Sequence, residues 1–194
     1  MSKLRLKYFE KALSFPKPNW LPVDLDLSNY NIYTEPKIKA SNYEELPQSL
    51  KEYYDKLGIP ESERKFLAGA SILDSEEIYS KSQEILEIPI EGIFVIASEN
   101  TIQAEHIIII ADEGSPVTYV EGCFAPRLST FSIHNGGVEV YVKDNAKVKY
   151  ITIQNWSSKI INIGNKRGIT YKNANLHWIE GSLSGYHSFS YPSE

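Results

Sequence analysis

The chain has 194 residues, a formal net charge of −5 and an isoelectric point near 5.5. This length suits one domain, and an acidic chain without a basic stripe does not fit a nucleic-acid-binding protein. The sequence has no apolar run of about 18 residues and no signal-peptide pattern, which predicts a cytoplasmic protein without a membrane span. Its one cysteine, Cys123, excludes an internal disulfide bond.

The first part of the chain predicts helices. Residues 1–15 carry apolar side chains at helical spacing, and residues 44–57 have acidic side chains early and lysines late. Pro60 is well placed to begin a third helix, and residues 74–86 predict a fourth. We therefore expect a helical N-terminal region over residues 1–88.

The remainder, residues 89–194, is dominated by Val, Ile, Tyr and Thr and is interrupted by Gly, Asn and Asp, as in strand-rich proteins. A weak repeat runs through it: VTYV at 117–120, VKYI at 148–151 and LHWI at 176–179, at spacings of 31 and 28 residues. Such a period indicates stacked coils of a β-solenoid, each packing against its neighbours. A sandwich or jelly roll built from hairpins is the alternative.

Cys123 is the first candidate for chemistry. Gly122 and Pro126 predict a turn in which its thiol is accessible, and Arg127 and His134 are near in sequence. A neighbouring cation favours the thiolate, the form needed for sulfur transfer or iron ligation. The alternative is a small buried hydrophobic side chain. The residues alone leave both interpretations open.

The other polar residues give weaker signals. His134 lies on a predicted strand, where a structural histidine is commoner than a ligand, and the four histidines are too scattered for zinc-ligand spacing. A metal site would therefore need ligands from across the fold or from another chain. Asn162 with residues 166–167 predicts a solvated basic face, and residues 112–113 are the one paired acid near the strands. The sequence contains no glycine-rich nucleotide loop, so we expect no bound nucleotide.

Three longer segments occur in a fixed order: KLGIPESERKFLAG at 56–69, IADEGS and YVEGCFAP within 110–126, and VKYITIQNW at 148–156. Together they resemble the SufB/SufD family of iron–sulfur cluster assembly scaffolds, and SufB more than SufD. The resemblance implies a mainly β fold, with a right-handed β-helix core that is truncated and follows a helical N-terminal region.

The resemblance also implies a scaffold role and no enzymatic activity. Cys123 would accept sulfur, with Glu121, Arg127 and His134 in support, and is a possible metal ligand. An iron–sulfur cluster would be present transiently. The implied partners are a SufC-like ATPase and a SufB- or SufD-like subunit, in a homo- or heterodimer.

One departure from the family concerns length, because its members are about twice as long as this chain. The missing part would hold a second reactive cysteine and the region that docks on SufC. A shortened structural or regulatory paralogue without chemistry of its own is therefore the alternative function. A carbohydrate-active solenoid enzyme fits poorly, since such enzymes need paired carboxylates and the acids here are spread out.

Overall fold

The computed structural model describes residues 65–67, 75–80, 89–96 and 98–194, and residues 11, 14, 16, 26, 30 and 48 individually. These residues form ten strands and no long helix. In chain order the strands are β1 (Lys65–Leu67), β2 (Ser75–Ser80), β3 (Ile90–Val95), β4 (Ile102–Ala111), β5 (Pro116–Phe124), β6 (Ser132–Val142), β7 (Lys147–Asn155), β8 (Ile160–Thr170), β9 (Asn175–Ser184) and β10 (His187–Ser193).

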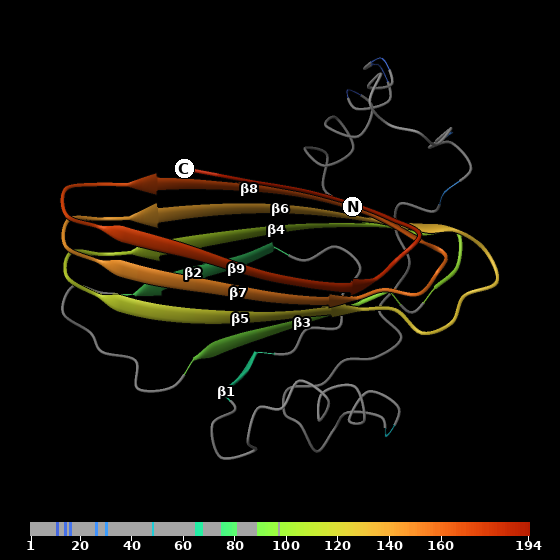
Figure 1. Cartoon of the computed structure of the whole chain (residues 1–194), viewed down its shortest axis with the longest axis horizontal. Helices are drawn as coiled ribbons and strands as arrows, with labels where there is room; N and C mark the ends of the chain where they lie inside the picture. Colours follow the sequence, from blue (N-terminus) through green and yellow to red (C-terminus); the bar gives the residue numbers. More distant parts are fainter. Residues whose placement is uncertain are drawn as a thin grey trace.

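The strands form two parallel sheets, an odd sheet ordered β1-β3-β5-β7-β9 and an even sheet ordered β10-β8-β6-β4-β2. The chain crosses from one sheet to the other after almost every strand, so each strand pairs with the strand two places along. Figure 1 shows the sheets face to face, with similar tight turns at one end and connections of varied length at the other. This arrangement is a β-solenoid of about four turns, as predicted, and every strand pairing in it is parallel.

The repeat seen in the sequence is the strand register of the odd sheet. Val117 pairs with Val148, which pairs with Leu176, and Tyr119, Tyr150 and Trp178 form the next inward column. The aromatic rings in this column are 5.1 and 5.2 Å apart between centroids. Equivalent side chains of successive coils therefore stack on one another, which explains the apolar-x-aromatic pattern.

The tight turns between the sheets also repeat. Each turn is closed by a hydrogen bond from the backbone N–H of its fourth residue to the C=O of its first, as from Ala146 to Lys143. The third residue has positive φ in all three turns, at 72° for Gly114, 59° for Asn145 and 55° for Asn173. Glycine and asparagine tolerate this conformation best, so the turn residues are chosen by backbone geometry.

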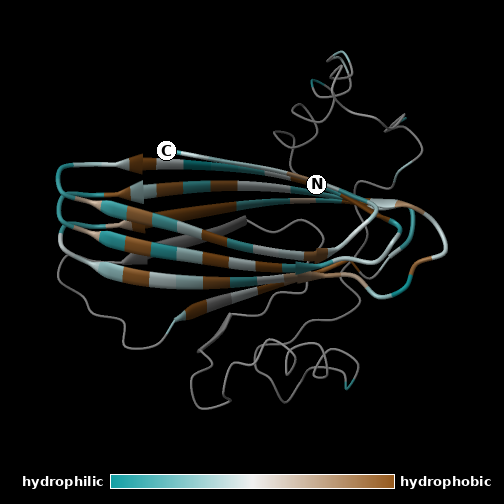
Figure 2. Ribbon diagram, viewed as in Figure 1, coloured by the Kyte–Doolittle hydropathy of each residue, from teal (hydrophilic) through white to brown (hydrophobic). Residues whose placement is uncertain are grey.

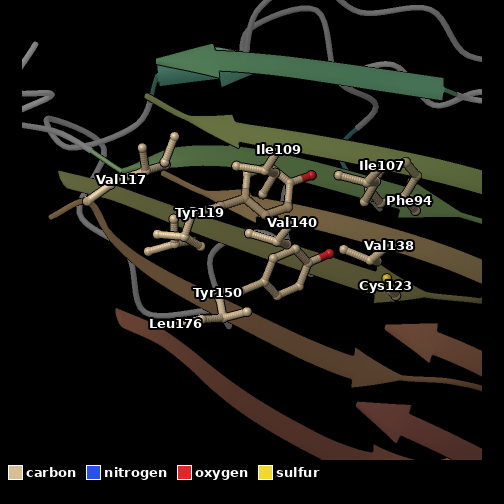
Figure 3. Close-up of a cluster of buried hydrophobic side chains, with 14 of the residues drawn as sticks. Phe94, Ile107, Ile109, Val117, Tyr119, Cys123, Val138, Val140, Tyr150 and Leu176 are labelled. Carbon is tan, nitrogen blue, oxygen red and sulfur yellow. The ribbon is translucent and has the colours of Figure 1, made fainter. Parts of the chain in front are cut away.

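The apolar core lies between the sheets, nearest the tight turns. Its side chains alternate along each strand with outward-facing ones, which gives the banding in Figure 2. Figure 3 shows the packed cluster, with Cys123 at one end of it, beyond Val138. Its buried members include Ile107, Ile109, Val117, Tyr119, Val138, Val140, Val148 and Tyr150.

One helix prediction is wrong over the described residues, because strand β2 lies where residues 74–86 predicted a helix. The helix predicted to begin at Pro60 starts outside the described residues, and residues 65–67 form β1. Both strands pair in the solenoid sheets, and a strand partner outweighs a weak local helix signal. The helices expected over 1–15 and 44–57 fall outside the continuous described ranges, and the domain boundary at residue 88 stays a prediction. No helix in the described part of the chain is long and apolar enough to cross a membrane.

Candidate functional site

The solenoid interior is polar at the end opposite the tight turns. On β4 the inward positions are Gln103 and Glu105 before the apolar run begins, and on β5 they are Glu121 and Cys123 after it ends. Strands of the two sheets run in opposite directions, so the start of β4 faces the end of β5 (Figure 1). Alternation along two strands therefore gathers acidic, thiol and amide groups in one buried region.

Cys123 lies within β5 and is 1% exposed, so the predicted accessible turn is wrong. Its Sγ donates a hydrogen bond to Oε1 of Glu121 at 2.7 Å. The other oxygen of the same carboxylate accepts the phenolic hydrogen of Tyr150. Glu121, predicted as a supporting residue, is thus the direct partner of the thiol.

The electrostatics around Cys123 differ from those expected. Burial raises the pKa of the thiol well above its usual range, and the nearby charges of Glu121 and Glu105 raise it further. Lys166 is the cation that acts in the opposite direction. Burial and Glu105 also raise the pKa of the Glu121 carboxyl. The thiol is therefore neutral in this environment, and a base beside it has increased proton affinity.

Arg127 lies in the loop after β5 and is exposed, whereas Lys166 is 4% exposed. The Lys166 ammonium is 2.9 Å from Oε2 of Glu180 and 5.3 Å from the ring centroid of Tyr150. The solvated basic face predicted for Asn162 and Lys166 is therefore wrong, because both side chains point inward from β8. Lys166 supplies the cation that the sequence had suggested for Arg127.

His134 is buried on β6 and is held from two sides. Its Nδ1 lies 2.7 Å from Oδ1 of Asn162, and its ring contacts Trp156 in a tilted arrangement, at 4.5 Å between centroids. Its Nε2 is 3.1 Å from Oε1 of Glu105. Burial alone would lower the pKa of His134, but the charge of Glu105 and the two side-chain partners outweigh it, and the pKa is raised.

Glu105, Cys123 and His134 form a group of three potential metal ligands. Their donor atoms, one oxygen, one sulfur and one nitrogen, all lie within 4.8 Å of one another, and all three residues are buried. They come from the consecutive strands β4, β5 and β6.

Sequence reasoning missed Glu105. The available signal was strand alternation. Glu105, Ile107 and Ile109 are alternate residues of one strand, so their side chains lie on the same inward face. Ile108 and Ile110 obscured this alternation, because four consecutive isoleucines do not show which face is buried. The acids at 112–113, which were singled out instead, lie in the tight turn after β4.

Comparison with known proteins identifies the family. A family model described as "SUF system FeS cluster assembly, SufBD core domain" matches residues 94–194. Curated proteins from Staphylococcus saprophyticus, Staphylococcus aureus and Staphylococcus epidermidis, each named iron–sulfur cluster assembly SufBD family protein, are 31% identical to this chain over 255 residues.

These matches cover 100% of this chain and 55% of each relative, so the chain spans about half the length of the curated relatives that it matches. No solved structure matches it. The family model covers more than half of the residues, including Cys123 and His134, and the relatives are similar along the whole chain. The chain therefore belongs to the SufBD family of SUF-system iron–sulfur cluster assembly proteins.

Proposed function

We propose that the chain acts in iron–sulfur cluster assembly as a SufB-like scaffold subunit that accepts sulfur on Cys123. The observation that carries this proposal is the hydrogen bond from the Cys123 thiol to Glu121, inside the domain that defines the family. A thiol with an adjacent carboxylate has the acceptor for its own proton, which the sulfur-transfer reaction requires.

The transfer proceeds from a persulfide donor, R–S–SH. The thiol proton of Cys123 moves to Oε1 of Glu121, and the resulting thiolate attacks the outer sulfur of the donor. A bond forms between Sγ and that sulfur while the donor S–S bond breaks, and the donor leaves as the thiolate R–S⁻. The sulfane sulfur is passed on as such, so no external oxidant or reductant is needed, and Lys166 provides compensating positive charge near the thiolate.

The remaining roles follow from the scaffold function. The chain works beside a SufC-like ATPase and a SufB- or SufD-like subunit, and it catalyses no turnover of its own. The iron–sulfur cluster is its transient product, with no nucleotide bound to this chain. The cytoplasmic location stays a prediction.

Persulfide loading tests the proposal. The chain would be incubated anaerobically with a cysteine desulfurase, a sulfur carrier and cysteine, and its intact mass followed in time. We expect one added sulfur atom that a reducing agent removes, and loading about a hundredfold slower in Glu121→Gln, which keeps the shape but not the base. Folded wild-type chain that stays unmodified while a full-length staphylococcal relative is loaded would refute the role of Cys123.

A second function, a structural or regulatory paralogue, is favoured by a different observation. The last coil exposes large apolar side chains: Ile179 at 39%, Leu183 at 69%, Tyr186 at 49% and Tyr191 at 43%. In this function the coil packs against a full-length subunit and Cys123 stays inert. Complex formation with a staphylococcal relative, lost in Leu183→Asp and combined with failed persulfide loading, would support it; a strictly monomeric chain would exclude it.

A further inference from the structure

The arrangement of Glu105 and His134 depends on a glycine. Glu105 pairs with Gly136 across β4 and β6, and His134 is two residues before Gly136 on the same inward face. A Cβ atom at Gly136 would lie 3.0 Å from Oε1 of Glu105 and 3.1 Å from Cε1 of His134. The missing side chain therefore makes room for the carboxylate and the imidazole to approach each other inside the solenoid.

The tautomer of His134 is set by Asn162. The side-chain nitrogen of Asn162 donates to Oε1 of Gln154 at 2.6 Å and contacts Oγ of Ser188 at 2.7 Å. Its Oδ1 is thus the atom that faces His134, and Nδ1 of the imidazole must donate to it. The lone pair of a neutral His134 is then on Nε2, directed toward Glu105 and Cys123. Metal-binding histidines are commonly oriented by such a carbonyl acceptor.

Two buried atoms of this group have no hydrogen-bond partner among the described residues: Nε2 of His134 and Oε2 of Glu105. The 3.1 Å separation of Nε2 from Oε1 brings the two groups together, but not in hydrogen-bond geometry. Both side chains are 1% exposed, so water outside the protein does not solvate them. A proton on Nε2 pairs the imidazole with Glu105, and when that proton is absent a metal cation between the two groups takes its place, bound by the Nε2 lone pair and the carboxylate.

We propose that Glu105, Cys123 and His134 bind one divalent first-row transition metal ion, with a fourth coordination position open. A carboxylate, a thiolate and an imidazole suit Zn²⁺, Co²⁺ and Fe²⁺, and the two anions balance the ionic charge. Metal–donor distances of about 2.0–2.3 Å place tetrahedral donors about 3.3–3.7 Å apart. The donors are within 4.8 Å now, so closure of about 1 Å by side-chain rotation completes the site.

Metal binding displaces the proton of the Cys123 thiol. The thiol donates to Glu121, so this proton moves to Oε1 of Glu121 when Sγ coordinates the metal. Metal binding does not depend on sulfur acceptance. Only the identity of the physiological ion as Fe²⁺ rests on the proposed function.

Anaerobic titration of the full chain with Co²⁺ tests the site. We expect one Co²⁺ per chain, a thiolate-to-cobalt charge-transfer band, the ligand-field absorption of a four-coordinate ion, and a rise in the unfolding temperature. His134→Ala and the isosteric Glu105→Gln should each weaken Co²⁺ binding at least about tenfold. His106→Ala is the matched control, because His106 is on the same β4 strand and contacts Glu139 at 3.0 Å on the outer face.

Several outcomes would overturn the proposal: a folded wild-type chain without the charge-transfer band, a band that persists in Glu105→Gln and His134→Ala, or equal weakening in His106→Ala. If His134→Ala does not fold, the proposal is judged from the Co²⁺ affinity of Glu105→Gln and from the change in the wild-type unfolding temperature on adding Co²⁺. Persulfide loading and Co²⁺ titration of the wild-type chain separate the two proposals. In the wild type, loading without metal binding refutes only the metal site, and metal binding without loading refutes only sulfur acceptance.

Discussion

Tyr150 and Cys123 donate to the two oxygens of one carboxylate, that of Glu121, although they lie on neighbouring strands β7 and β5. The phenol and the thiol thus donate one hydrogen bond to each oxygen of a carboxylate that is buried in the solenoid interior. Buried carboxylates need such partners, since desolvation without hydrogen bonds is costly. The geometry that positions the thiol is therefore also part of what stabilises the fold.

We first predict that Tyr150→Phe destabilises the chain by about 1.5–3 kcal/mol, because the buried Glu121 carboxylate loses a hydrogen bond. Urea denaturation followed by circular dichroism measures the change. Tyr141→Phe is the matched control, since Tyr141 donates to Glu139 at 2.6 Å on the outer face, where water replaces the lost bond. Equal losses in the two variants would contradict the importance of the buried pair.

The second prediction concerns the turn at Asn145, which has φ of 59°. Asn145→Ala should lower the free energy of unfolding by about 1 kcal/mol, because an alanine Cβ is unfavourable in the left-handed region. Asn145→Gly, which removes that conflict, should cost less than the alanine variant. Thermal or urea unfolding compares the three chains, and an alanine variant as stable as the glycine variant would argue against the turn conformation.

Third, Gly92→Ala should destabilise the chain by about 1–3 kcal/mol through overpacking. The new Cβ would collide with the hydroxyl group of Tyr119, which is fully buried in the core. Gly181→Ala provides the comparison, because its Cβ would meet nothing closer than a backbone oxygen of Thr152 at 3.9 Å. A drop in unfolding temperature confined to Gly92→Ala is the expected result.

The fourth prediction concerns pH and the Lys166–Glu180 pair. Partial burial acts to raise the pKa of Glu180, but hydrogen bonds from Ser190 and Lys166 and the Lys166 charge outweigh it and lower the pKa. A lowered folded-state pKa contributes stability above the unfolded pKa, about 4.3 for Glu, and this contribution disappears as pH falls through the folded value.

Glu180→Gln should therefore reduce stability at pH 7 by less than about 1 kcal/mol, given the partial exposure of Glu180, and the difference from wild type should vanish in acid. Denaturation curves at several pH values measure it. Lys166→Met should remove the same part of the pH dependence. The prediction would be contradicted if the loss of stability in Glu180→Gln, relative to wild type, became larger as the pH was lowered.

The sequence repeat predicted the solenoid because each repeat of the sequence corresponds to one coil of the structure. Tyr119, Tyr150 and Trp178 occupy one column, so their spacing in the sequence equals the length of one coil. The helix predicted over residues 74–86 failed for the opposite reason. Its acids and caps are local signals, whereas β2 is a strand by pairing with β4, which lies well beyond any local window.

The candidate site was only partly predictable. Cys123, Glu121 and His134 were identified, but the buried state of Cys123 depends on β5 continuing past Gly122, and local sequence suggested a turn there. Lys166 looked solvated because a lysine on a strand is usually exposed, and its burial depends on Glu180, in the following strand. The burial of Cys123 and of Lys166 is determined by contacts between strands, and the sequence close to each residue does not reveal those contacts.

The recurring positive-φ turns have an evolutionary consequence. Because Asn145 and Asn173 hold equivalent places 28 residues apart, a segment of one such length can be duplicated or lost while the inward columns between the turn and the bulge near Gln154 stay in phase. A change by an odd number of residues within a strand would instead turn the remaining side chains of that strand to the opposite face. Proteins built on this plan are thus expected to differ in length by whole coils.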